Sequence, residues 1–242
     1  MMKGMILAGG RGSRLQPCTN IISKALLPVY NRPMIYYPLN ALLQAGIKDI
    51  LFIVSPYHAE DFFELLGDGS QYQARFSYKI QKEPRGIAEA FIIGKEFIGN
   101  DNITMILADN IFVDDISAEI ENFKSGGKIF VKAVPDPERF GVVEINKDGK
   151  ATSIEEKPKN PKSNLAITGI YIYDSRVTEI ATSVQPSERG ELEVTDLHRW
   201  YMEQGELEVK MIYEEWIDAG TFESLYAAQT LARDKLQNKM IN

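Results

Sequence analysis

The sequence of 242 residues predicts an α/β fold, with a mostly parallel sheet flanked by helices and an inserted antiparallel part. In the first half, short continuous apolar runs alternate with segments of helical period, which is typical of parallel strands buried on both faces. In the second half, two strand-like runs flank Lys147-Asp148-Gly149, and this Asp-Gly turn favours a hairpin. No repeat and no linker rich in Pro, Gly or Ser separates the halves. We therefore expect one domain over residues 1–242.

Each expected element follows from its local pattern, because apolar runs predict buried strands and apolar residues three or four apart predict helices. In the first half these elements are a strand over 5–8, a helix around 36–45, a strand over 50–54, a helix over 61–66, a strand over 76–80, a helix over 87–97 and a strand over 103–107. In the second half they are hairpin strands over 141–145 and 151–155, a strand over 165–173, and helices over 193–204 and 221–232.

Composition excludes several classes of protein. The formal net charge is −7, whereas a protein that wraps nucleic acid needs a basic surface. One cysteine and two histidines exclude a disulfide framework and a zinc site built from Cys or His. No apolar run approaches the roughly 20 residues of a membrane helix, and the apolar run at the N-terminus is too short for a signal peptide. We expect a cytoplasmic protein that binds neither nucleic acid nor membrane.

The glycine loop directly after the first strand carries the strongest functional signal. Its three glycines, Gly9, Gly10 and Gly12, let the backbone pass close to a ligand and turn N–H groups toward a phosphate. A P-loop is excluded because Ser13-Arg14 follows Gly12, and a dinucleotide fingerprint is excluded because Leu15 stands at its third glycine position. The loop predicts an anion site with its own cation, and a tight turn with solvated charges is the structural alternative.

These residues, with Lys24 and the Pro28-Val29 pair, resemble the signature of the sugar nucleotidyltransferases, and most of all that of the glucose-1-phosphate thymidylyltransferases. The matching stretches are 9–17, 24, 28–29, 36–38, 66–70, 91–94, 136–143 and 189–196. The resemblance implies a Rossmann-like sheet with a nucleotide-binding part over about 1–134, a sugar-binding part over about 135–215, and a metal-binding turn and C-terminal helix over about 216–242. It also implies transfer of a nucleotidyl group to a sugar 1-phosphate with release of pyrophosphate.

In-line attack of a sugar phosphate on an α-phosphorus needs aligned cations more than a covalent nucleophile. The resemblance assigns Arg14 and Lys24 to the triphosphate, and Lys157 and Arg189 to the sugar phosphate. Taken singly, each of these side chains would be read as a solvated surface charge.

Two aspartates are candidate ligands for Mg²⁺, which prefers carboxylate oxygens and few protein ligands. Asp109 follows a buried strand, at the sheet edge where open α/β folds place ligands. Asp218 lies in the stretch 216–221, and in the family both aspartates hold the metal. A helix N-cap for Asp109 and a turn position for Asp218 are the alternatives.

Recognition of the base and the sugar is implied less directly. The amide of Gln81 can both donate to and accept from a pyrimidine edge, and Gly86 allows close approach to the base. The expected nucleotide-binding residues are Leu7, Gly9, Gly10, Gly12, Ser13, Arg14, Gln81, Pro84, Gly86 and Asp109. The expected sugar-binding residues are Asn110, Gly141, Glu156, Lys157, Thr168, Tyr171 and Trp216. For both aromatic residues, core packing is the alternative.

The resemblance implies that dTTP and α-D-glucose 1-phosphate are converted to dTDP-glucose, a precursor of dTDP-rhamnose, and pyrophosphate, by a homo-oligomer (dimer or tetramer). A uridylyl- or cytidylyltransferase acting on a hexose 1-phosphate and a non-catalytic sugar-nucleotide-binding relative remain alternatives. Two residues depart from the family pattern. Ala108 replaces a common Gly beside the metal site, and Glu89 replaces a common Gln, which adds an anion near the base. The chain also resembles a short form without a C-terminal regulatory extension.

Overall fold

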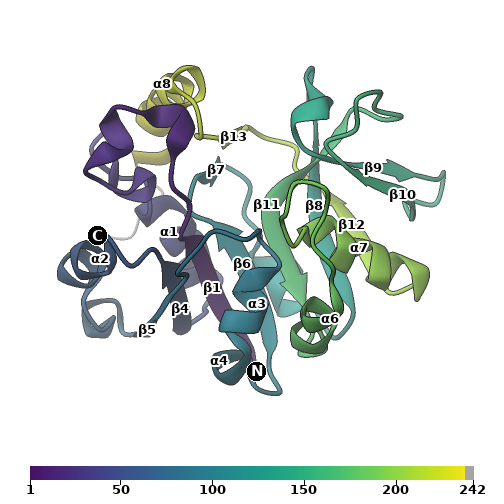
Figure 1. The fold of residues 1–242 in the computed structure, drawn as a ribbon, viewed down its shortest axis with the longest axis horizontal. Helices are drawn as coiled ribbons and strands as arrows, with labels where there is room; N and C mark the ends of the chain where they lie inside the picture. Colours follow the sequence, from purple (N-terminus) through teal and green to yellow (C-terminus); the bar gives the residue numbers. More distant parts are fainter. Residues whose placement is uncertain (238–242) are drawn as a thin grey trace.

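The computed structural model describes residues 1–237 and is built around one mixed sheet of nine strands (Figure 1). In the parallel part, the first strand of the chain lies between its two parallel neighbours. In spatial order this part contains β6 (Asn102–Leu107), β1 (Met2–Ala8), β4 (Asp49–Val54) and β5 (Arg75–Ile80). These are the four strands expected in the first half, each longer by one to three residues at its amino end.

The antiparallel part continues from β6 through the long strand β11 (Leu165–Tyr173). This strand pairs with β8 (Gly127–Ala133) and at one point with β9 (Gly141–Ile145), while β12 (Leu207–Met211) pairs in parallel with β8. The expected hairpin is confirmed, because β9 pairs with β10 (Ala151–Glu156) and Gly149 adopts the left-handed conformation in the turn between them. The sheet thus runs through both halves of the chain.

Helices cover both faces of the sheet, and two apolar clusters lie beneath them. On one face, α1 and α2 bury Leu39 and Phe62 against strand residues such as Phe52. On the other face, α3, α6 and α7 bury side chains such as Phe91 and Tyr201. The helices are α1 (Tyr36–Gln44), α2 (Ala59–Leu66), α3 (Glu89–Ile93), α4 (Lys95–Ile98), α5 (Ser117–Glu121), α6 (Val177–Ser183), α7 (Val194–Glu203) and α8 (Phe222–Leu231).

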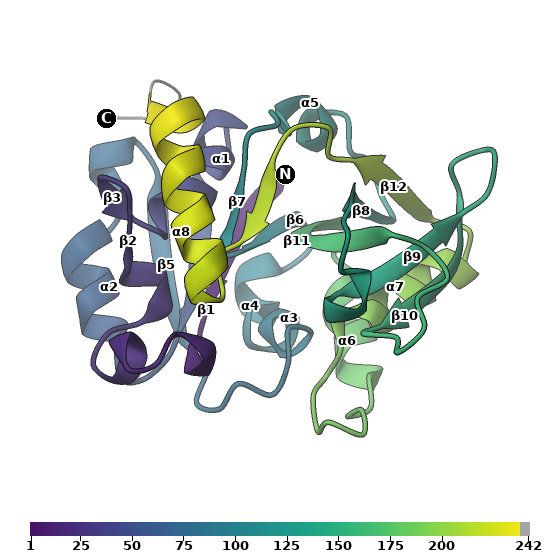
Figure 2. The ribbon, with the colours of Figure 1, turned by 90° about the horizontal axis from the view of Figure 1, so that it is seen from above.

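Two small pairs of strands stand outside the main sheet. β7 (Asn110–Phe112) pairs antiparallel with β13 (Trp216–Asp218), and β2 (Pro28–Val29) pairs with β3 (Arg32–Pro33). Figure 2 shows the yellow chain crossing from the antiparallel part to α8, which packs beside β2 and α1. The crossing brings the C-terminal part of the chain over the carboxyl ends of the parallel strands.

The α/β class and the order of the expected elements are confirmed, with one helix divided. The helix expected over 87–97 consists of α3 and α4, which meet at Gly94. A Cβ at Gly94 would lie 2.5 Å from Cε of Met5, so the glycine lets this bend pack on β1. The expected C-terminal helix continues from α8 into a π-helix over Ala232–Leu236, and residues 238–242 lie outside the described part. No helix among residues 1–237 is long and apolar enough to cross a membrane.

Candidate active site

A cavity of about 540 Å³ opens at the carboxyl ends of β1, β5 and β6 and extends to β9 and β10. Open α/β sheets place ligands at this edge. The structure brings most of the expected site residues together here. Those that line the cavity are Leu7, Gly10, Arg14, Lys24, Gln81, Pro84, Gly86, Asp109, Asn110, Gly141, Glu156, Lys157, Tyr171, Trp216 and Asp218.

The glycine loop contributes Gly10 and Arg14 to the cavity lining, but not Gly9, Gly12 or Ser13. Gly12 has a φ of 63°, in the left-handed region that favours glycine, and Ser13 begins a short 3₁₀ helix. A Cβ at Gly12 would also lie 3.0 Å from the side chain of Thr19. Gly12 and Ser13 therefore turn the chain, and this turn carries Arg14 back to the cavity.

The base side of the expected site is built around Gln81, which directly follows β5 and is almost fully buried. A Cβ at Gly9 would lie 2.2 Å from Oε1 of Gln81, so Gly9 leaves room for this amide. Gly86 lines the cavity, but a Cβ added at this position would lie 2.4 Å from the backbone oxygen of Leu192. The lack of a side chain at Gly86 therefore allows the backbone around Leu192 to pack closely against it. Glu89 lies behind Gln81 and accepts a hydrogen bond of 2.9 Å from its Nε2.

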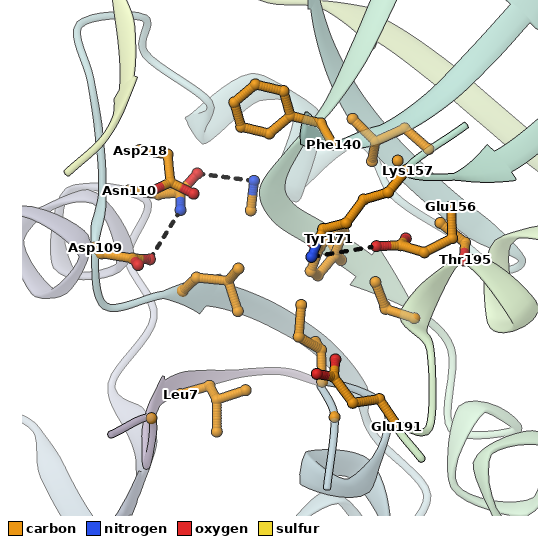
Figure 3. A pocket seen from close by; sticks show the side chains of 18 of the residues that line it. Leu7, Asp109, Asn110, Phe140, Glu156, Lys157, Tyr171, Glu191, Thr195 and Asp218 are labelled. Carbon is orange, nitrogen blue, oxygen red and sulfur yellow. Dashed lines mark hydrogen bonds and ion pairs between the residues drawn. The ribbon is translucent and has the colours of Figure 1, made fainter. Parts of the chain in front are cut away.

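Asp109 and Asp218 lie near each other at the other end of the cavity (Figure 3), because β7 and β13 pair there. The N–H of Ala219 donates to the carbonyl oxygen of Asp109 at 2.8 Å, which fixes the two segments in register. The ammonium of Lys24 forms an ion pair with Oδ2 of Asp109. Strand pairing thus brings the two expected metal ligands together. Lys24, which was expected to bind the triphosphate, forms an ion pair with one of them, Asp109.

The two aspartates differ in electrostatic environment, and Asp109 is buried whereas Asp218 is half-buried. Burial opposes ionisation of Asp109, but the Lys24 cation and a hydrogen bond from Asn110 hold the pKa of Asp109 below its ordinary value. Burial and the negative charge of Asp109 raise the pKa of Asp218, against the opposing Lys24 and Arg14 cations. The net effect at Asp218 therefore disfavours ionisation in spite of these two cations, and a further cation beside it would favour its ionised form.

Asn110 connects the acidic pair to the sugar side of the cavity. Its Nδ2 donates to Oδ1 of Asp109 at 3.1 Å. Its Oδ1 accepts from Nε1 of Trp216 at 2.6 Å and from the N–H of Gly169 at 2.8 Å. The indole of Trp216 is therefore held by a polar contact as well as by packing.

Glu156 and Lys157 lie opposite the acidic pair across the cavity (Figure 3), with Nζ of Lys157 4.0 Å from Oε1 of Glu156. Burial and the nearby Glu193 raise the pKa of Glu156, against the Lys157 and Arg189 cations. Lys157 has a φ of 42°, a left-handed conformation that is costly for a residue with a side chain. Gly141 lines the same region, where a Cβ would lie 3.4 Å from Oε2 of Glu156.

Arg189 and Thr168 do not line the cavity, although both were expected in the site. The guanidinium of Arg189 forms an ion pair with Glu193 at 3.0 Å and lies 3.7 Å from the carboxylate of Glu156. Arg189 therefore contacts the site only through Glu156, which lines the cavity. Thr168 is fully buried and donates to the carbonyl oxygen of Phe130 at 3.0 Å. In this structure Thr168 is part of the sheet interior.

The methyl group of Ala108 also points away from the cavity. Ala108 is buried in the apolar cluster beneath α1 and α2 and does not line the site. The added methyl that distinguishes it from glycine is therefore taken up by core packing.

Several cavity residues were not expected. The rings of Phe140 and Trp216 meet edge to face at 5.3 Å between centroids and form an aromatic wall. The unexpected lining residues are Ile87, Leu107, Arg139, Phe140, Ile167, Gly169, Glu191, Val194, Thr195 and His198. About half of them fall within the stretches 136–143 and 189–196, which match the family pattern, so their place in these motifs could have marked them as site residues. The apolar residues outside these two stretches, and His198, could not be distinguished from core residues by their sequence pattern.

The acidic pair fits the requirements of Mg²⁺. Within residues 1–237, no group of three or more His, Cys, Asp or Glu side chains could hold a metal ion. A zinc or calcium cage is therefore not built here, whereas Mg²⁺ takes one or two carboxylates and keeps phosphate oxygens and waters in its other positions. Asp109 and Asp218 offer that donor set beside a cationic loop.

The chain is similar to known enzymes over nearly its whole length. It is 50% identical over 238 residues to a glucose-1-phosphate thymidylyltransferase of Neisseria meningitidis, covering 96% of this chain and 83% of that protein. It is 47% identical to one of Mycobacterium tuberculosis, covering 96% of this chain and 82% of that protein.

Among solved structures, the chain matches a protein of Bacillus anthracis, provisionally assigned as a glucose-1-phosphate thymidylyltransferase and crystallised with sucrose. The TM-score is 0.92 and the identity 47%, covering 97% of this chain and 96% of that one. A UDP-glucose pyrophosphorylase in complex with UDP-glucose matches with a TM-score of 0.84 at 24% identity, covering 97% and 100%, a likeness that shows the fold alone.

The profile of the family described as "Nucleotidyl transferase" matches residues 3–235. This range contains the glycine loop, both aspartates of the cavity and the Glu156-Lys157 pair. The match, the relatives at 47–50% identity and the shared fold lead to one conclusion: the chain belongs to the nucleotidyl transferase family and is a nucleotidyltransferase.

Proposed function

We propose that this protein is a Mg²⁺-dependent glucose-1-phosphate thymidylyltransferase, which converts dTTP and α-D-glucose 1-phosphate to dTDP-glucose and pyrophosphate. The observation that carries the proposal is one cavity with a cationic glycine loop and the aspartates Asp109 and Asp218 at one end, and the Glu156-Lys157 pair at the other. The relatives of that name, at 47–50% identity over 96% of the chain, support the choice of substrates.

The chemistry requires an oxygen of the sugar phosphate to form a bond to the α-phosphorus while the bond from that phosphorus to the bridging oxygen breaks. The electron pair of the broken bond leaves with pyrophosphate. A sugar phosphate is already ionised at neutral pH, so no residue needs to act as a general base. The chain's task is to align two anions and to offset their charge.

The residues divide this task by position. Arg14 and Lys24 bind the triphosphate, and Asp109 and Asp218 hold Mg²⁺, which supplies charge neutralisation on the phosphate oxygens when bound. Lys157 binds the phosphate of the sugar, and Glu156 accepts hydrogen bonds from sugar hydroxyls. Arg189 keeps Glu156 in place from behind the cavity. The Phe140–Trp216 wall gives the hexose an apolar surface.

A non-catalytic, sugar-nucleotide-binding role is disfavoured because the chain retains all five charged residues that the reaction needs, and all five line one cavity. These residues are Arg14, Lys24, Asp109, Lys157 and Asp218. The oligomeric state and the cytoplasmic location remain predictions.

The test is pyrophosphate release by the purified protein with Mg²⁺ and glucose 1-phosphate, with dTTP, UTP, CTP, GTP and ATP supplied in turn. We expect release that requires both substrates, is fastest with dTTP, stops with EDTA and returns when Mg²⁺ is added back. Faster release with UTP or CTP would support the uridylyl- or cytidylyltransferase alternative. No release with any nucleotide would contradict the proposal.

A further inference from the structure

Lys24 lies between the glycine loop and the acidic pair of Asp109 and Asp218. Its ammonium forms an ion pair with Oδ2 of Asp109. A Cβ added at Gly10 would lie 3.8 Å from Cε and 4.0 Å from Nζ of the same lysine, so the ammonium also lies beside the loop. The backbone of Lys24 is fixed at the start of a short 3₁₀ helix, where its carbonyl oxygen accepts from the N–H of Leu27 at 3.1 Å. A change in side-chain torsions alone would therefore move the ammonium from the carboxylate toward the loop.

Both oxygens of Asp109 have partners within the chain. Oδ2 is paired with Lys24, and Oδ1 accepts from Nδ2 of Asn110 at 3.1 Å. The side chain of Asp109 is 7% exposed and that of Lys24 is 18% exposed, so water and salt screen their attraction only weakly. A buried carboxylate needs such a counterion, because an unpaired charge away from water is costly. Lys24 therefore neutralises one of the two carboxylates proposed to hold Mg²⁺.

A metal ion at Asp109 would meet the ammonium of Lys24 at close range. Two cations on one carboxylate repel each other, and the repulsion is stronger in a buried site than in water. The second carboxylate also has a cation nearby, since a Cβ added at Gly220 would lie 2.7 Å from both Nη2 of Arg14 and Oδ1 of Asp218. Cations of the chain thus offset part of the negative charge that would attract a metal.

We propose that Lys24 competes with the metal for Asp109, so that the acidic pair becomes a tight metal site only once the ammonium has left. The inference rests on the proposed function in one respect, that Asp109 and Asp218 hold the metal. In the proposed reaction the triphosphate is the anion that draws the ammonium away, because Lys24 is one of the two cations assigned to it. A metal offered without nucleotide then binds weakly.

The test measures binding of the metal alone, without nucleotide or sugar phosphate. Mn²⁺ replaces Mg²⁺, because both suit carboxylate oxygens and because electron paramagnetic resonance counts free Mn²⁺ directly. We expect Lys24→Met to lower the Kd for Mn²⁺ at least about tenfold, since it removes the competing charge at close range. In the double variant Lys24→Met/Asp109→Asn this gain should disappear. An unchanged Kd in Lys24→Met overturns the proposal.

The matched control is Lys157→Met, which removes the same charge from the opposite end of the same cavity (Figure 3). It should leave the Kd for Mn²⁺ within about twofold of the wild-type value, because water and salt in the open cavity screen a distant charge. If Lys157→Met tightens Mn²⁺ binding as much as Lys24→Met does, the total charge of the cavity controls the metal, and the proposal is overturned.

Thermal unfolding is a second readout, which separates this role of Lys24 from that of a purely structural ion pair. Lys24→Met leaves the carboxylate of Asp109 without its cation and should lower the unfolding temperature. Mg²⁺ alone should then raise the unfolding temperature of the variant by more than that of the wild type, because a ligand that binds more tightly stabilises the folded state more. Equal shifts in both proteins contradict the proposal.

Lys24→Gln, which keeps a polar side chain, repeats both measurements and serves if Lys24→Met does not fold. It should tighten Mn²⁺ binding in the same direction, and wild-type affinity in this folded variant overturns the proposal. If Asp109→Asn weakens Mn²⁺ binding but neither Lys24 variant tightens it, the metal site stands and the competition alone is overturned. Failure of the proposed metal site has a different signature, since Asp109→Asn would then leave the affinity of both the wild type and Lys24→Met unchanged.

Discussion

Asp109 and Asp218 belong to two segments far apart in the chain, and one backbone hydrogen bond fixes their relation: the N–H of Ala219 donates to the carbonyl oxygen of Asp109 at 2.8 Å. This contact and the pairing of β7 with β13 place the buried carboxylate of Asp109 beside the half-buried carboxylate of Asp218. Each carboxylate makes ionisation of the other less favourable. Lys24 forms an ion pair with Asp109, whereas Lys24 and Arg14 offset the charge on Asp218 only in part. Such a pair is costly to the fold but suited to a divalent cation.

Neutralising either aspartate should stop the reaction without unfolding the protein. We expect Asp109→Asn and Asp218→Asn each to lower kcat for pyrophosphate release by several orders of magnitude, because each removes one of the two charged ligands proposed for Mg²⁺. Asp148→Asn, at the exposed tip of the hairpin, is the control and should leave the rate unchanged. Circular dichroism checks the fold, and near-normal turnover in a folded double variant would remove the metal assignment.

Lys157→Ala should separate the two substrates. Because Lys157 lies across the cavity from the acidic pair, its loss should raise the KM for glucose 1-phosphate at least about tenfold and change nucleotide affinity little. Lys159→Ala, which changes an exposed lysine nearby, should leave both constants unchanged. Equal losses of sugar-phosphate and nucleotide affinity would contradict the placement of Lys157. Steady-state kinetics with each substrate varied in turn make the measurement.

The two glycines after β1 should respond differently to alanine. A Cβ at Gly9 would lie 2.2 Å from Oε1 of Gln81, whereas a Cβ at Gly10 would lie 3.8 Å from Cε of Lys24, an ordinary contact. We therefore expect Gly9→Ala to displace Gln81 and to weaken dTTP binding at least about tenfold, with a smaller effect from Gly10→Ala. Calorimetry with dTTP measures both, and a larger loss in Gly10→Ala would argue against the position of Gln81.

His198 should make the fold sensitive to acid. Its ring is fully buried, and neither nitrogen has a hydrogen-bond partner among the described residues. Burial, with the Arg199 cation as a second cause, lowers the pKa of His198 to about 3, whereas a histidine in the unfolded chain titrates near 6.5. Between these values the unfolded chain binds a proton that the folded protein does not, so the free energy of unfolding falls as the pH falls from about 6.5 toward 3.

His198→Phe removes this proton and should make the loss of stability in acid shallower. Urea unfolding at several pH values between about 7 and 4 measures the slope of the free energy against pH. Parallel slopes for the wild type and the variant would show that another group controls the acid response.

Most of the fold could be predicted from the sequence where burial is continuous. The runs over 50–54 and 103–107 became β4 and β6 with one further residue at each amino end, because strands buried on both faces are apolar throughout. Strands β8 and β12 were not expected. In β12, glutamate and lysine alternate with apolar residues, which is the pattern of a partly exposed strand and a weak signal. β13 has three residues and is a strand only because β7 pairs with it.

The site residues could be predicted from the sequence where they belong to recognisable motifs. Gly10 and Arg14 of the glycine loop, both aspartates and the Glu156-Lys157 pair all line one cavity. Thr168 did not, since a motif marks a stretch of chain and the pleat of β11 turns alternate side chains to opposite faces. Arg189 also stayed off the lining, because three nearby carboxylates, from Glu156, Glu191 and Glu193, hold it.

By itself, the sequence determined the α/β class and the residue types available for a nucleotidyl transfer, and it predicted an anion loop after the first strand. Local periodicity and short motifs carry that information, because strand burial and loop chemistry depend on neighbours in the chain. The family resemblance paired Asp109 with Asp218, but only the tertiary structure showed how strand pairing brings them together, and that Glu89 faces Gln81 instead of the cavity. These relations depend on which distant segments pair and on which groups lose water, and neither property is encoded in any local pattern.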